Sequence, residues 1–188
     1  MDLVFFGIQG SGKGTQAKHL AAEFGYDIFE AGGELRKIKA SGSELGKTVA
    51  SYIDQGKLVP FEIIMQVAKE AILARPKDQQ ILFDGIPRDQ DQMRAFDEIM
   101  RDTGRKFHCV HILLDLEDAI ARIVGRAQKE GRIDDADEAV VRRRMNTFLE
   151  KTVPVIEAYK AQNMLSEVDG KGAVEEVYQR LKEVLRVE

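Results

Sequence analysis

Glycines and a single lysine dominate one short stretch, "GIQGSGKGTQ", at residues 7–16. Glycine permits backbone conformations with positive φ and lets the main chain approach a ligand closely. At the start of a helix, the backbone N–H groups of such a loop converge on an anion, and Lys13 would add a charge that reaches the outer phosphates. The spacing Gly7-x-x-x-x-Gly12-Lys13 is that of a phosphate-binding loop. The stretch therefore predicts a site for a phosphorylated ligand.

Two details of this loop leave other interpretations open. Gly14 stands where Ser or Thr is usual, and Thr15 follows it. A dinucleotide-binding fingerprint counted from Gly10 fails because its third glycine falls on Thr15, although Glu30, about 20 residues further on, could imitate the acid that binds a ribose. A flexible turn without a ligand is the other alternative. The lysine favours the phosphate-binding loop over both.

A carboxylate follows a second apolar run. The run "ILF" at 81–83 ends in Asp84, and "GIPR" comes next. At the tip of a central parallel strand beside a phosphate loop, a carboxylate is well placed to hold Mg²⁺ through its waters. Arg88 would project over the same crevice. The alternative is an ordinary surface turn.

Arginines are concentrated in one third of a chain whose net charge is −4. The overall charge does not favour nucleic acid as a general partner. A local cluster of arginines on an acidic protein instead suits a small, highly anionic ligand. The clustered residues are Arg122, Arg126, Arg132, Arg142, Arg143 and Arg144.

Short apolar runs alternate along the chain with longer amphipathic stretches. The strand candidates are 2–6, 27–29, 80–84, 108–114 and 164–168. The helix candidates are 13–24, 61–74, 89–102, 116–126, 137–161 and 173–186. This alternation predicts βα units and a mainly parallel sheet, in an α/β fold with ligands at the carboxyl ends of the strands.

Two segments depart from that alternation. Residues 30–59 are expected to form two short helices divided by "SGS" at 41–43, with no strand between them. Residues 126–136 are polar and contain glycine. Both are candidates for excursions from the sheet that could move, and ordinary surface loops are the alternative for each.

The composition limits the class of protein. A chain of 188 residues with 44% apolar residues fits one domain with a sizeable core. No apolar run approaches the ~20 residues of a membrane span, and the first residues lack a signal-peptide pattern. Cys109 is the single cysteine, so we expect no internal disulfide, no cysteine-rich zinc site and a buried thiol in a cytoplasmic protein. His19, His108 and His111 are expected on helix surfaces and strands rather than as ligands.

Several motifs, in order from end to end, resemble those of the adenylate kinases within the nucleoside monophosphate kinases. They are "GIQGSGKGTQ", "SGSELGK", "GKLV", "DGIPR" with Gln92, "RIVGR", "GRIDDADE" before "RRR", and "VDGKGAV". The resemblance implies one domain over 1–188 with a three-layer αβα P-loop fold and a five-stranded parallel sheet. It also implies a helical monophosphate-binding insertion at about 30–59 and a short lid, without zinc, at about 126–136.

The resemblance also implies a role for individual residues. Lys13, Arg88, Arg132 and Arg144 would be catalytic. ATP would be bound by Gly10, Ser11, Gly12, Lys13, Gly14, Thr15, Arg126 and Gly172. AMP would be bound by Ala31, Arg36, Lys57, Leu58, Val59, Gly85, Ile86, Pro87, Arg88, Gln92, Arg132 and Arg144. Mg²⁺ would accompany ATP and be held by Asp84 through water. The expected ligands are ATP, AMP and ADP, and the protein is expected to be a monomer.

One departure from the family pattern concerns the acceptor. Adenylate kinases usually have Ser-Thr-Gly-Asp where this chain has "EAGG" at 30–33, so a hydroxyl at 31 and a carboxylate at 33 are missing. Glu34 is a possible substitute for the carboxylate. Ala31 is typical of UMP/CMP kinases, whereas Gln92 is typical of adenylate kinases, and its amide could flip to pair with uracil.

Two assignments therefore remain open, namely the reaction and the arginine that binds the phosphates. A UMP/CMP or broad-specificity kinase, and a nucleotide-binding regulator with little turnover, stand beside the adenylate kinase. Arg144 is chosen because it precedes Pro154 by the family's spacing, but Arg143 could take its place.

Overall fold

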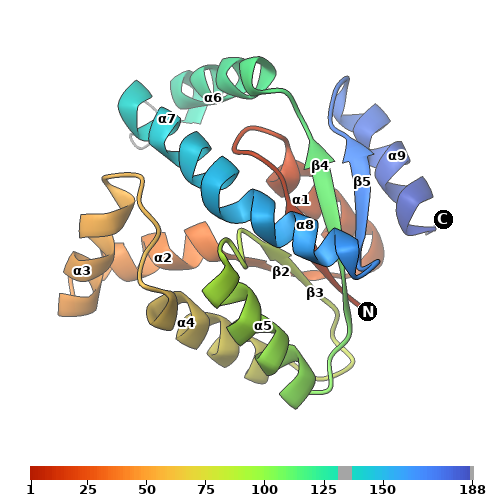
Figure 1. The fold of residues 1–188 in the computed structure, drawn as a ribbon, viewed down its shortest axis with the longest axis horizontal. Helices are drawn as coiled ribbons and strands as arrows, with labels where there is room; N and C mark the ends of the chain where they lie inside the picture. The colour runs from red at the N-terminus through yellow and green to blue at the C-terminus, as the bar shows by residue number, and fades with distance from the viewer. Residues whose placement is uncertain (131–136, 187–188) are drawn as a thin grey trace.

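The computed structural model describes residues 1–130 and 137–186, without the side chains of 126–130 and 138. Its centre is a five-stranded sheet in the order β2-β3-β1-β4-β5, and every pairing is parallel (Figure 1). The strands are β1 (Asp2–Phe6), β2 (Asp27–Glu30), β3 (Ile81–Asp84), β4 (Phe107–Leu113) and β5 (Leu165–Asp169). The predicted parallel α/β sheet is confirmed, with strand ends shifted by one residue at most.

All five residues of β1 are buried, and they alternate between the two faces of the sheet. Leu3 and Phe5 pack in the core on one face, whereas Val4 and Phe6 pack in the core on the other. This is the two-residue period of a strand, and a continuous apolar run is what a strand covered on both faces requires.

Helices cover both faces and make a three-layer αβα arrangement (Figure 1). Residues of α4 (Phe61–Leu73), α5 (Gln90–Asp102) and α8 (Val153–Ala161) share one apolar core with the strands. Residues of α1 (Lys13–Phe24) and α9 (Val174–Leu185) share the other. The predicted layers are confirmed. None of the helices in the described part of the chain is long and apolar enough to cross a membrane.

Two helix pairs stand outside these layers. The first pair is α2 (Ala31–Ala40) and α3 (Glu44–Ile53), the two short helices expected within 30–59. The second is α6 (Leu116–Glu130) and α7 (Glu138–Thr147), which form a small core of their own with Ile8 of the loop after β1. Both pairs therefore lie near the carboxyl ends of the strands (Figure 1).

Two helix predictions were wrong in their extent. The helix expected at 116–126 continues to Glu130, so the first residues of the expected lid are helical. The helix expected at 137–161 is interrupted by a π-helical turn, Phe148–Thr152. Pro154 follows that turn, and since proline has no N–H and its ring would collide with the carbonyl of the preceding turn, a wider turn there relieves the conflict.

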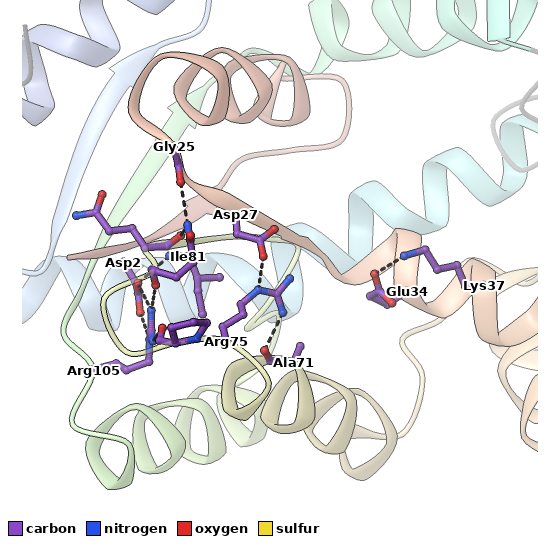
Figure 2. Close-up of polar contacts among 12 residues, drawn as sticks. Asp2, Gly25, Asp27, Glu34, Lys37, Ala71, Arg75, Ile81 and Arg105 are labelled. Atoms are coloured by element: carbon purple, nitrogen blue, oxygen red, sulfur yellow. Dashed lines mark hydrogen bonds and ion pairs between the residues drawn. The ribbon is translucent and has the colours of Figure 1, made fainter.

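A buried ion pair joins the amino ends of the central strands (Figure 2). The Asp2 carboxylate accepts from Arg105 Nε at 2.6 Å and Nη2 at 2.9 Å, and from the backbone N–H of Ile81 at 2.8 Å. Ile81 begins β3, and Arg105 precedes β4. One carboxylate thus joins β1 to both neighbouring strands at the amino ends of the strands.

Candidate active site

A cavity of about 710 Å³ lies at the carboxyl ends of the strands, where Phe6, Glu30 and Asp84 end β1, β2 and β3. Such a crevice is where open parallel sheets bind ligands. The predicted residues that line it are Gly10, Ser11, Gly12, Lys13, Gly14, Thr15, Ala31, Arg36, Lys57, Leu58, Val59, Asp84, Gly85, Ile86, Pro87, Arg88, Gln92, Arg144 and Gly172. Predicted residues from distant segments of the chain thus meet at one place. The Arg126 side chain and Arg132 lie outside the described residues.

The phosphate loop connects β1 to α1 and needs glycine at defined positions. Gly10 has φ 87°, and a Cβ there would lie 2.7 Å from the backbone O of Ala119. Gly12 has φ 96° and caps the N-terminus of α1. The loop therefore leads directly into the N-terminus of α1 at the wall of the cavity, and a helix start is a place where proteins bind anions.

Lys13 lies against the carbonyls of the same loop. Its Nζ donates to the backbone O of Gly7 at 2.6 Å and of Ile8 at 3.2 Å. These contacts hold the ammonium group within the ring of the loop. A phosphate in the loop would meet this positive charge together with the backbone N–H groups.

Asp84 lies beside the phosphate loop, as expected. A Cβ on Gly14 would be 3.6 Å from Asp84 Oδ2, so the two chain segments are close neighbours. A carboxylate oxygen is a ligand that suits Mg²⁺. No three His, Cys, Asp or Glu side chains converge as a metal site among the described residues. The donor set therefore fits an ion that takes most of its ligands from phosphates and water.

Guanidinium groups from three elements converge in the cavity around Arg88. The pKa of Arg88 is lowered, first by desolvation and then by Arg144 and Arg36, while Asp84 and Glu30 act in the opposite direction. The Arg88 side chain still reaches water in the cavity, and arginine stays protonated in proteins, so all three remain cations. Like charges held together in this way favour a multiply charged anion between them.

A carboxylate that the sequence analysis did not assign holds one of these arginines. Glu30 Oε1 accepts from Arg36 Nη2 at 2.7 Å. A Cβ on Gly33 would lie 3.2 Å from Glu30 Oε2, so Glu30 occupies the space beside position 33. Glu34, the possible substitute for the missing carboxylate, instead pairs with Lys37 one turn along α2 (Figure 2).

The arginines of α6 and α7 divide between the cavity and its surroundings. Arg144 lines the cavity, whereas Arg143 Nη1 donates to the backbone O of Gln55 at 2.9 Å at the end of the α3 segment. Arg122 was named in the arginine cluster but was given no role in the site. It lines the cavity, and its Nη2 donates to the backbone O of Gly170 at 3.1 Å. Its spacing of four residues from Arg126 on an amphipathic stretch was the signal that could have found it.

The wall near α2 and α3 is apolar. Leu35, Ile53, Val59 and Ile64 line this side of the cavity, and the Ala31 side chain is buried there. Gln92 of α5 also lines the cavity, with only 2% of its surface exposed. This arrangement suits a flat heterocycle with a few polar edge atoms.

Comparison with known proteins agrees with this geometry. A family model described as adenylate kinase matches residues 5–164. The adenylate kinase of Thermus thermophilus is 38% identical over 186 residues, which is 98% of this chain and 97% of that protein. The adenylate kinases of a Nocardioides species and of Maricaulis maris are 37% and 36% identical, over 100% and 94% of this chain and 98% and 94% of their own lengths. The chain belongs to the adenylate kinase family.

Proposed function

We propose that the cavity carries out the reaction of adenylate kinases, the reversible transfer of a phosphoryl group from MgATP to AMP that gives two ADP. The observation that carries the proposal is that Arg36, Arg88 and Arg144 line one cavity together with a phosphate loop and Asp84. Phosphoryl transfer needs in-line positioning and neutralisation of charge on the migrating group, with little covalent help from the protein.

On the donor side, the backbone of Gly10 to Thr15 would cradle the ATP phosphates, with Lys13 on the group that is transferred. Arg126 and the backbone near Gly172 would hold the rest of the nucleotide, and we add Arg122 to this set because it lines the cavity. Backbone N–H groups and guanidinium groups are both donors that suit phosphate oxygens.

On the acceptor side, Arg36 and Arg88 would bind the phosphate of AMP, and Lys57 to Val59, Gly85 to Pro87 and Gln92 would surround the nucleoside. Arg132 and Arg144 would close on the phosphates between the two nucleotides. The fork of a guanidinium can bind two phosphate oxygens at once, which fixes geometry as well as charge.

Use of MgATP follows from the family, and we propose that Asp84 holds the ion through water. When bound, Mg²⁺ neutralises charge on the phosphates and helps to orient them. Asp84 would fix the position of that hydrated ion beside Gly14, where the two segments lie within van der Waals reach.

Residues 30–59 and about 126–136 would act as an AMP-binding subdomain and a short lid. Closure of such segments excludes water, so that ATP is not simply hydrolysed. The end of the first segment contacts α7. Arg143 Nη1 donates to the backbone O of Gln55, and a Cβ on Gly56 would lie 3.0 Å from the backbone O of Val140.

We further propose a cytoplasmic monomer. Cys109 is buried as expected, and burial raises the pKa of its thiol, which leaves it unreactive in a reducing compartment.

A broad-specificity monophosphate kinase is the second candidate. Ala31 brings no polar group to the base pocket, and its Cβ lies 3.6 Å from where a Cβ on Gly85 would be. The test is a coupled assay of ADP formation with AMP, UMP, CMP and GMP at saturating MgATP. We expect AMP to have the highest kcat/KM. A higher value for UMP or CMP favours the second candidate, and ATP binding without turnover on any acceptor favours a regulator.

A further inference from the structure

The side-chain amide of Gln92 has a defined orientation at the wall of the cavity. Its Oε1 accepts from the backbone N–H of Arg88 at 2.9 Å. Its Nε2 lies 3.4 Å from Asp89 Oδ2, a long contact in which the amide can only donate. A backbone N–H donates and a carboxylate accepts, so both neighbours require the oxygen on the Arg88 side and the NH₂ group on the Asp89 side.

The groups that impose this orientation are themselves held in place. Asp89 Oδ1 accepts from the backbone N–H of Gln92 at 2.8 Å and so caps α5. The hydroxyl of Thr152, in the π-helical turn, donates to the backbone O of Arg88 at 2.8 Å. The peptide groups of Arg88 are therefore fixed on both sides, and Gln92 is almost completely buried. A flipped amide would turn its NH₂ group against a backbone N–H that then has no acceptor, which is costly in a buried site.

We propose that Asp89 and the backbone N–H of Arg88 lock Gln92 and make the site select acceptors by the hydrogen-bonding pattern of the base. The free lone pair on Oε1 can accept from an exocyclic amino group, and the second N–H of Nε2 can donate to an unprotonated ring nitrogen. Adenine and cytosine present that pair of groups. Hypoxanthine, guanine and uracil present a carbonyl beside a ring N–H, which demands the flipped amide.

Asp89 is thus a positioning residue for specificity, and it acts through Gln92. The inference rests on the proposed function, in which the cavity near Gln92 receives the base of the monophosphate. It changes the expectation from sequence that the amide can flip freely to accept uracil. Ring size and hydrogen-bonding pattern become two separate sources of discrimination.

The first test compares acceptors whose bases have the same ring size, so that differences in how well the base fills the pocket do not affect the ratio. AMP is paired with IMP and CMP with UMP, and kcat/KM is measured for each at saturating MgATP. We expect the amino-bearing partner to be preferred by about 5–150-fold in each pair, the range for one unsatisfied buried polar group. Normal turnover of AMP with equal use of IMP would overturn the lock but leave the proposed function standing. No turnover of AMP would remove the proposed function itself.

The second test uses Asp89→Asn. The asparagine oxygen can still cap α5, but its NH₂ group would face the NH₂ group of Gln92 and favour the flipped amide. We expect the AMP:IMP and CMP:UMP ratios to fall by about 2–10-fold, as for loss of one ordinary hydrogen bond. Asp91→Asn is the matched control, because Asp91 lies in the same turn, is exposed and contacts Arg94 rather than Gln92.

The ratios separate positioning from a general structural effect. A purely structural loss in Asp89→Asn would lower kcat/KM for all four acceptors alike and leave both ratios unchanged. That outcome, or an equal fall of the ratios in the Asp91→Asn control, would overturn the role of Asp89. Thermal unfolding of both variants shows whether the fold is retained, and we expect transitions close to that of the unchanged protein.

Discussion

Replacement of Lys13 by Met tests the centre of the candidate site. Methionine keeps the length of the stem but removes the charge, together with the two hydrogen bonds from Nζ to the carbonyls of Gly7 and Ile8. Loss of one preorganised electrostatic contact to the migrating phosphoryl group should lower kcat by about 10²–10³.

The same contacts predict a cost in stability. Hydrogen bonds to a charged group contribute about 1.5–3 kcal/mol when well shielded, and this ammonium group is only partly buried. We therefore expect the free energy of unfolding to fall by about 1–3 kcal/mol, and Tm by roughly 2–12 °C for a chain of this size.

Two measurements check the prediction for Lys13→Met. ADP formation is followed at saturating MgATP and AMP, and thermal unfolding is followed by circular dichroism. Lys69→Met is the control, because Lys69 is an exposed lysine of α4 outside the cavity lining. Near-normal turnover in Lys13→Met would refute the assignment of the phosphate loop. An unchanged Tm would show that the contacts to the loop carbonyls contribute no stability.

Four further predictions follow from the same structure. A bisubstrate compound of two adenosines joined by five phosphates should bind far more tightly than ATP or AMP and, at about a hundred times its dissociation constant, raise stability by about 2.7 kcal/mol; binding no tighter than ATP, measured by calorimetry, would mean that the two nucleotide sites do not face each other. Glu30→Gln should lower the KM for AMP by up to about 5-fold with kcat unchanged, because an exposed ion pair worth about 0.2–1 kcal/mol no longer competes with the acceptor phosphate; a higher KM would show that Glu30 orients its guanidinium partner instead. Asp2→Ala should lower the free energy of unfolding by about 3–5 kcal/mol in urea titrations, since it leaves a buried guanidinium without its carboxylate, and adding Arg105→Met should recover part of the loss; an additive double variant would contradict this. Burial is the main cause that lowers the pKa of His111, so as pH falls the unfolded chain binds this proton before the folded protein does, and stability falls below about pH 6.5. His111→Gln should reduce the fall in Tm between about pH 7 and pH 5. A pH profile of Tm identical to that of the unchanged protein would show that His111 does not contribute.

Much of the site could be predicted because its signals are local. The phosphate loop depends on glycine conformations and helix capping within residues 7–16, and the structure has the loop and α1 where the pattern indicated them. Asp84 follows directly from its place at the end of a strand that is buried on both faces. Bends within helices were harder to predict: the π-helical turn before Pro154 depends on how a long helix packs against its neighbours as well as on the proline.

Contacts between distant parts of the chain decided the rest. The sequence by itself determined the parallel α/β fold, the phosphate loop and which arginines were candidates, since apolar periodicity and glycine spacing act over a few residues. Only the tertiary structure decided that Glu30 pairs with Arg36 while Glu34 pairs with Lys37, and that Arg144 rather than Arg143 lines the cavity. Neighbouring residues on a helix differ by about a third of a turn, so one position separates the cavity from solvent. A side chain's partner is set by where its helix or strand packs, which no short sequence window contains.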